Sequence, residues 1–174
     1  MRNLAAALLL AMPTLAAPAD IVASLSRRAD AEGVESVNAY LSDHWESAMN
    51  ALSEHVVACA PAAMSLALRL YRSHNVEATS AHAESLRQAM TNCPAKLLPI
   101  VPPDLVPTVC ALPDSVTDAQ FQAVGRHEVA RLRADSSLAG SRNGRACIAA
   151  YEQQAQRAAL GPWQSNDDKR RPMR

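Results

Sequence analysis

Four widely separated cysteines constrain the fold of this sequence more than any other feature. They are Cys59, Cys93, Cys110 and Cys147, and no two form a C-x-x-C pair. Zinc ribbons and haem attachment need closely spaced ligands, so an even number of isolated cysteines in an exported chain favours two disulfides. Three pairings are possible. We favour Cys59–Cys93 and Cys110–Cys147, because each would close one helical hairpin and contribute roughly 3.5–4 kcal/mol through loop entropy.

The beginning of the chain predicts export. Arg2 precedes the apolar run Leu4–Met12, Pro13 interrupts it, and a small-x-small cleavage site ends at Ala16. This is the pattern of a secretory signal peptide over residues 1–16, and the apolar run is shorter than the roughly 20 residues that cross a bilayer. We therefore expect a periplasmic or secreted protein without a membrane span.

Helical patterns dominate the remainder. Aromatic residues make up only 3% of the chain, and alanine, leucine and valine carry its 49% of hydrophobic residues, which favours helices over strands. The strongest signal is a stripe at steps of three and four that predicts one long helix: Val34, Val37, Leu41, Trp45, Met49, Leu52, Val56 and Cys59. A short helix near residues 21–28 precedes it.

Residues that start or stop helices divide the rest of the chain. Pro61 is placed to start a helix, and further helices are expected over about 78–92, from the capping box of Thr117 and Gln120, and over about 145–160. Residues 136–144 read as a loop, and the apolar, proline-rich stretch 94–113 reads as a connector packed across the core. The prediction is an all-α, disulfide-stapled bundle of five or six helices with a proline-rich connector. It forms one helical domain, 17–161, followed by a flexible basic tail, 162–174.

Charge is distributed unevenly along the chain. Residues 17–125 hold six basic and twelve acidic residues, whereas residues 126–174 hold ten basic and five acidic ones. The basic third could meet an acidic partner protein or the acidic half of its own chain, or could be a solvated surface. The density of charge is too low for a nucleic-acid footprint. The candidate partner-binding residues are Arg126, Arg131, Arg133, Arg142 and Arg145.

No motif in the sequence predicts catalysis, a cofactor or a metal. His55 and Cys59 have a metal-ligand spacing, but a disulfide would consume Cys59 and no third ligand can be named. His127-Glu128 begins like a zincin motif, yet Arg131 stands where the second histidine should be. Nucleophile elbows, phosphate loops and dinucleotide fingerprints are absent from the sequence. We therefore predict no catalytic, cofactor-binding or metal residues, although a site made of distant residues would leave no local trace.

A family resemblance concerns about a third of the chain. It is carried by Cys110, Pro113, Val116, Thr117, Gln120 and Val124, and by the segment RACIAAY with Cys147 and Tyr151. In these residues the chain resembles the small periplasmic immunity proteins of type VI secretion, the Rap/Tai type, which block cell-wall amidase effectors. The resemblance implies a short, exported, helical, disulfide-bonded protein. The long connector departs from the family, and no inhibitory loop can be carried over residue by residue.

The sequence thus predicts an exported non-enzymatic protein-binding factor, most concretely an inhibitor or immunity protein against a periplasmic toxin. An accessory component of an envelope secretion or conjugation apparatus is the nearest alternative. A hydrolase or metal-binding protein with a site of scattered residues is the alternative from another class. An adjacent toxin gene would favour immunity, and a run of secretion genes would favour the accessory role.

Overall fold

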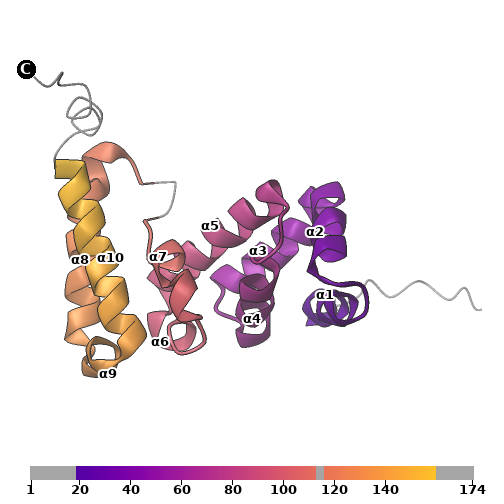
Figure 1. Ribbon diagram of the computed structural model, residues 1–174, viewed down its shortest axis with the longest axis horizontal. Coiled ribbons are helices and arrows are strands. Elements are labelled where there is room, and N and C mark those ends of the chain that lie inside the picture. Colours follow the sequence, from indigo (N-terminus) through magenta and orange to yellow (C-terminus); the bar gives the residue numbers. More distant parts are fainter. Residues whose placement is uncertain (1–18, 113–115, 160–174) are drawn as a thin grey trace, which may run out of the picture.

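The computed structural model describes residues 19–112 and 116–159. These residues are mainly helical, with short turns between the helices, and contain no strand. The predicted signal peptide, 1–16, and the predicted tail, 162–174, lie outside the described residues. The molecule is elongated, with the first helices at one end and a helical hairpin at the other (Figure 1). The predicted all-α class is therefore confirmed.

The described residues form ten α-helices rather than five or six. The four additional helices arise in three places: the predicted long helix is divided in two, the connector forms two short helices, and the predicted loop 136–144 forms one. The main elements follow the predicted order along the chain. None of the described helices is both long and apolar enough to span a membrane.

The first helix, α1 (Ala19–Glu32), ends at Gly33. Gly33 has a φ of 85°, a left-handed conformation that glycine adopts without steric cost. The chain then turns into α2 (Val34–Asp43). Arg69, from the later helix α4 (Pro61–Leu70), holds α1 by donating one hydrogen bond to the Ala29 carbonyl oxygen, at 2.8 Å, and another to Asp30.

The prediction of one continuous helix from Val34 to Cys59 is wrong. His44 leaves helical geometry, and a π-helical turn, η1 (Trp45–Met49), precedes α3 (Asn50–Val57). The His44 carbonyl oxygen accepts from the Met49 amide at 3.3 Å, five residues on. The apolar stripe takes two successive steps of four residues here, from Leu41 to Trp45 and from Trp45 to Met49. Each step is longer than the 3.6-residue turn of an α-helix, and the wider π turn returns the stripe to the buried face. Trp45 is only half-buried, while Met49 stays in the core.

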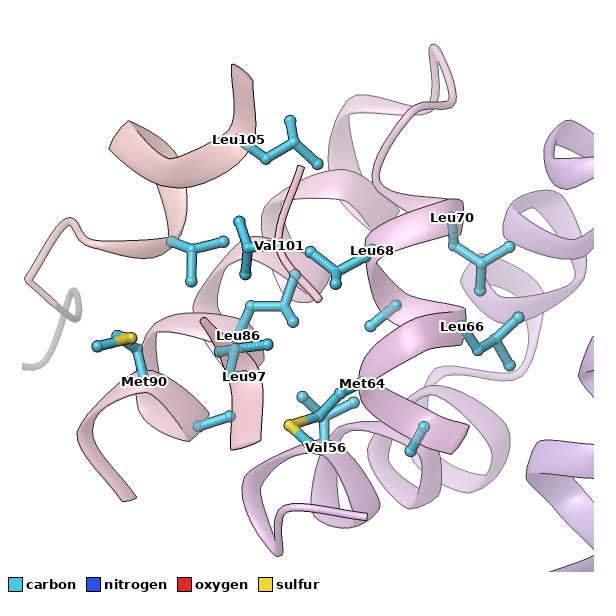
Figure 2. Close-up of a cluster of buried hydrophobic side chains, with 14 of the residues drawn as sticks. Val56, Met64, Leu66, Leu68, Leu70, Leu86, Met90, Leu97, Val101 and Leu105 are labelled. Carbon is cyan, nitrogen blue, oxygen red and sulfur yellow. The ribbon is translucent and has the colours of Figure 1, made fainter. Parts of the chain in front are cut away.

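The next two helices begin where the sequence predicts. Pro61 is the first residue of α4 (Pro61–Leu70), where its missing amide hydrogen costs nothing. Asn75 caps α5 (Val76–Asn92), and its side-chain oxygen accepts from the Ala78 amide at 3.0 Å. Both helices bury an apolar face between α3 and the connector, as Figure 2 shows for Met64, Leu86 and Met90.

The connector packs across the core, as predicted, through three short helical segments. These are α6 (Pro94–Leu97), the 3₁₀ turn η2 (Pro103–Leu105) and α7 (Val106–Val109). The prolines prevent a long helix, so the chain advances by single turns. Its buried side chains are Leu97, Leu98, Val101, Leu105, Val106 and Val109, several of which Figure 2 shows against α4 and α5. Ile100 is the exception and is 40% exposed.

Both predicted disulfides are present: Cys59–Cys93, with sequence separation 34, and Cys110–Cys147, with separation 37. Cys59 follows α3 in a left-handed conformation, φ 64°. Its amide donates to the Val56 carbonyl at 2.9 Å and the Ala60 amide donates to the His55 carbonyl at 3.0 Å. This is the Schellman ending that usually takes glycine, and here it aims the cysteine at Cys93.

The C-terminal hairpin pairs α8 (Asp118–Ala134) with α10 (Arg142–Ala159). Gln120 reaches back to Thr117, accepting from its amide at 3.2 Å and its hydroxyl at 2.8 Å, as in the predicted capping box.

The predicted loop 136–144 instead contains the short helix α9 (Ser136–Gly140). Asp135 nucleates it by accepting from the Ser137 and Leu138 amides, at 3.0 and 3.2 Å. Gly144 then packs so tightly that a Cβ there would lie 1.8 Å from the Leu138 carbonyl oxygen. The polar and glycine residues of this segment therefore form a sharp corner between helices and not an open loop.

Candidate functional site

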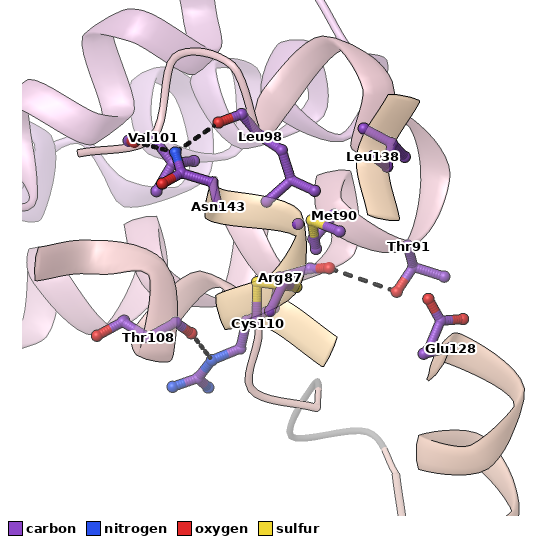
Figure 3. Close-up of a disulfide and its surroundings, with 12 residues drawn as sticks. Arg87, Met90, Thr91, Leu98, Val101, Thr108, Cys110, Glu128, Leu138 and Asn143 are labelled. Carbon is purple, nitrogen blue, oxygen red and sulfur yellow. Dashed lines mark hydrogen bonds between the residues drawn. A yellow bond between two sulfur atoms is a disulfide. The ribbon is translucent and has the colours of Figure 1, made fainter. Parts of the chain in front are cut away.

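The hairpin is fastened to the connector by a covalent bond and by side-chain amides. Cys110 and Cys147 are fully buried. Asn143 donates to the carbonyl oxygens of Leu98, at 2.9 Å, and Val101, at 2.8 Å (Figure 3). These two carbonyl groups, which follow the C-terminal end of α6, thereby gain hydrogen-bond partners.

Gln154 fastens the other end of α10. Its oxygen accepts from the Leu112 amide at 3.1 Å, and its nitrogen donates to the Cys110 carbonyl at 3.1 Å. The Gln154 side chain thus provides hydrogen-bond partners for two backbone groups of the connector that have no partner in a helix. Asn143, the disulfide and Gln154 together hold one face of α10 against the connector, and the outer surface of the hairpin remains open.

A groove of about 550 Å³ lies along that open surface between α8 and α10. Its lining comes from Gly125, Arg126, Val129, Ala130 and Arg133 of α8 and from Tyr151, Glu152, Ala155 and Gln156 of α10. The floor is apolar and built from small side chains, whereas the rim carries charge. Arg133 bridges the rim through a 2.6 Å contact between its Nη2 and Glu152 Oε1, with both side chains substantially exposed.

Two of the five predicted arginines line this groove. Arg126 is exposed and makes no ion pair or hydrogen bond within the described part of the chain. Arg133 lies seven residues later on the same face of α8 and is 60% exposed at its side chain. The structure therefore brings Arg126 and Arg133 together on one surface.

The other three predicted arginines lie elsewhere. Arg131 turns inward, where its Nε donates to Glu128 Oε2 at 3.1 Å and its Nη2 donates to the Met90 carbonyl at 3.0 Å. Arg142 is exposed beside a separate 400 Å³ depression at the α9 corner. Arg145 donates to the Gly140 carbonyl oxygen. These residues do not share a surface with the groove, so the candidate interface narrows to Arg126 and Arg133.

A buried carboxylate that sequence reasoning passed over explains the position of Arg131. Glu128 is only 3% exposed, and its oxygens meet Arg131 and, at 3.4 Å, His127 Nδ1. The Glu-x-x-Arg spacing was the available signal, because residues three apart adjoin on a helix. Nearby, the hydroxyl of Tyr151 is buried without a hydrogen-bond partner among the described residues. Burial, reinforced by the Glu128 charge, raises the pKa of that phenol.

A second buried polar group joins α2, α4 and α5. Asn38 donates to the Leu70 carbonyl, at 2.9 Å, and to the Ser73 hydroxyl, at 2.7 Å, and its oxygen lies 2.9 Å from His82 Nε2. His82 is 1% exposed, and burial lowers its pKa to about 4. The imidazole is therefore neutral and donates to Asn38. This network is sealed from solvent, so it supports the fold and offers no surface to a substrate.

The described residues do not bring together the metal-ligand or catalytic groups that the sequence motifs suggested. Cys59 is bonded to Cys93, so the His55–Cys59 spacing cannot bind a metal through that sulfur. Across residues 19–112 and 116–159, no three His, Cys, Asp or Glu side chains come together as metal ligands would. His127 is exposed and contacts only Glu128 among the polar groups described.

Comparison with models of protein families, with curated proteins and with solved structures finds no match to this chain.

Proposed function

We propose that this protein is an exported, non-enzymatic binding factor that acts as an inhibitor or immunity protein against a periplasmic toxin. The observation that carries the proposal is the groove on the open side of the hairpin. It combines an apolar floor with two exposed arginines, Arg126 and Arg133. Protein interfaces combine such a desolvated centre with a polar rim and are enriched in arginine.

Three further observations support export and protein binding. Two disulfides suit an oxidising compartment, where such bonds persist. The chain opens with the pattern of a signal peptide. The immunity role comes from the resemblance of the C-terminal half to the Rap/Tai type. Of the residues that carry the resemblance, Gln120 and Val124 lie in α8, and Cys147 and Tyr151 lie in α10.

The partner should present an acidic surface. Residues 116–159 contain six arginines and four acidic residues, and one of those acids, Glu128, is buried against Arg131. Among the residues that line the groove, two arginines, Arg126 and Arg133, stand against one acid, Glu152, so the charge at the rim is positive. Such a surface steers an acidic partner and raises its association rate, an effect that salt screens.

Affinity capture from envelope extract tests the proposal. The mature, disulfide-bonded protein is the bait, at low and high salt, beside the double variant Arg126→Glu with Arg133→Gln. The matched control, Arg27→Glu with Lys96→Gln, changes the net charge equally at exposed positions outside the groove. We expect one stoichiometric toxic protein whose activity falls in proportion to occupancy. The groove variant should bind it about tenfold more weakly, and the control should bind normally.

Two results would overturn the proposal. One is the recovery of no stoichiometric partner together with turnover of a small substrate that a single His or Ser substitution abolishes, which would indicate an enzyme. The other is a partner belonging to an envelope secretion apparatus, without toxic activity, which would indicate the accessory role.

A further inference from the structure

If the proposed function is correct, the shape and charge of the groove also indicate which kind of partner segment it binds. The hairpin is only two helices thick, and the connector covers α10 on one side through Cys147, Asn143 and Gln154. The hairpin stands at one end of the molecule (Figure 1), and the groove between α8 and α10 lies on its surface. Two packed helices leave a groove that a third helix can fill, because side-chain ridges of one helix fit between those of its neighbours.

The floor of the groove allows a close approach. Ala130 of α8 and Ala155 of α10 are among its lining residues, and Val129 lies between the two helices. Alanine side chains keep the surface low, so the axis of an incoming helix could lie about 8–10 Å from those of α8 and α10. An extended strand would leave its backbone amides unpaired against this floor, since a helical surface offers no free backbone partners.

The charges on the rim have helical spacing. Arg126 and Arg133 are seven residues apart, which is about two turns, or roughly 10.5 Å along α8. A helix running beside α8 would place carboxylates at positions i and i+7 at the same separation. Glu152 faces Arg133 across the groove at 2.6 Å, so a carboxylate on the α10 side would be repelled. The acidic residues of the partner should therefore lie along α8.

We propose that the groove binds an amphipathic α-helix of the partner protein, with small apolar residues on its contact face and carboxylates at i and i+7 toward Arg126 and Arg133. Binding completes a three-helix bundle on the disulfide-fastened hairpin. Arg133, already held over the rim by Glu152, loses little further freedom when it meets the second carboxylate.

Synthetic peptides test this inference with the mature protein. The first has about 18 residues, long enough to hold a helix, with alanine and leucine on one face and glutamates at i and i+7. The second moves the later glutamate by two positions, which places the two acids on different faces. The third carries a central proline. Fluorescence anisotropy measures binding, and circular dichroism measures helix content.

Protein variants locate the peptide. Ala130→Trp and Gln156→Trp each fill the groove from an exposed position on one helix, whereas Ala146→Trp adds the same ring at an exposed position of α10 that does not line the groove. The first peptide should bind and gain helix content, and either groove variant should weaken it at least about tenfold. Ala146→Trp should leave binding unchanged, and the second and third peptides should bind at least about tenfold more weakly than the first.

Equal binding of all three peptides, no binding of the first, or insensitivity to both groove variants would overturn the helical inference. Capture of a toxic partner that depends on Arg126 and Arg133 would in that case leave the proposed function standing. Failure of the capture experiment would remove the proposed function itself, so the two failures are distinguishable.

Discussion

The α1–α5 region and the α8–α10 hairpin are held in place by different means. In α1–α5 the long apolar side chains are fully buried, including Leu41, Leu52, Met64, Leu70 and Leu86. The hairpin is fastened to the connector through a buried disulfide and two amide side chains, Asn143 and Gln154. Burial of apolar surface stabilises both regions, since Leu132 and Tyr151 of the hairpin are also fully buried. The hairpin is in addition positioned by the disulfide and the amide side chains that attach it to the connector.

This difference separates stability from binding. A hairpin that is fastened at one face does not need its outer face for stability, so that face is free to carry exposed arginines around a groove. An arginine at one of the buried positions of α1–α5 would be costly, because a buried charge needs a partner. The comparison therefore predicts that changes at the attachments loosen the hairpin alone, and that changes in the apolar core affect the whole molecule.

Removing the attachment disulfide should have the largest effect. The double variant Cys110→Ala with Cys147→Ala should lose roughly 4 kcal/mol of stability by loop entropy. Hydrogen exchange should rise first in α8–α10 and remain slow in α3 and α5. Simultaneous loosening of both regions would show that the hairpin and the core form one cooperative unit, contrary to the comparison.

Leu52→Ala should cost about 3 kcal/mol, because Leu52 is fully buried in α3 and its removal leaves a cavity. Chemical denaturation measures the loss, with exposed Glu54→Ala of the same helix as the control, expected within about 0.5 kcal/mol. Exchange should rise in α1–α5 as well as in the hairpin. A loss as small as that of the control would remove the basis for placing the main core here.

Acid should weaken the α1–α5 region through His82. Its pKa of about 4 in the folded protein lies below the ordinary histidine value of 6.5, so its stabilising effect is full above pH 6.5 and is lost as pH falls through 4. Linkage gives a loss of about 2 kcal/mol between pH 7 and pH 5. His82→Gln should reduce stability at pH 7 and flatten this slope, whereas His55→Gln on α3 should keep it. An unchanged slope in His82→Gln would refute this account of the buried network.

Asn143→Ala should have the smallest effect, about 1 kcal/mol, because the two carbonyls it satisfies can recover water. The loss should appear as faster exchange in α9 and the first turns of α10, with α3 unchanged. Asn50→Ala, at an exposed position on α3, provides the matched control. A loss spread evenly over the molecule would argue against a local attachment.

The features that the sequence predicts correctly depend on local chemistry. Pro61 starts a helix because its ring fixes φ. The even number of widely spaced cysteines favours two disulfides, but which cysteines pair depends on packing between distant segments. The burial of the connector follows from its many Leu and Val residues between prolines. The helix start and the burial of the connector depend on near neighbours in the chain, so predicting them requires no knowledge of the packing.

The features that the sequence missed depend on packing between distant segments. The Asn38–His82 hydrogen bond joins residues 44 apart, and nothing local distinguishes either one. Arg131 belongs to the same basic cluster as Arg126, yet its side chain turns inward to Glu128 and the Met90 carbonyl.

For the candidate site, the sequence identifies the residues on the α8 side of the groove but not those on the α10 side. The seven-residue spacing of Arg126 and Arg133 places both on one face of α8 from the sequence alone. Which residues of α10 lie opposite them depends on how the two helices align across the α9 corner that joins them. The pairing of Arg133 with Glu152 therefore could not be predicted.

Hydrogen exchange of the complex with the captured partner tests the central claim most directly. The peptides to follow cover residues 125–133 of α8 and 151–157 of α10, with α1 and α4 as internal references. We predict that the partner slows exchange in the two hairpin segments, that this protection weakens in the Arg126→Glu, Arg133→Gln variant, and that α1 and α4 stay unchanged. Protection confined to α1–α4, with the α8–α10 groove exchanging as in the free protein, would contradict the account.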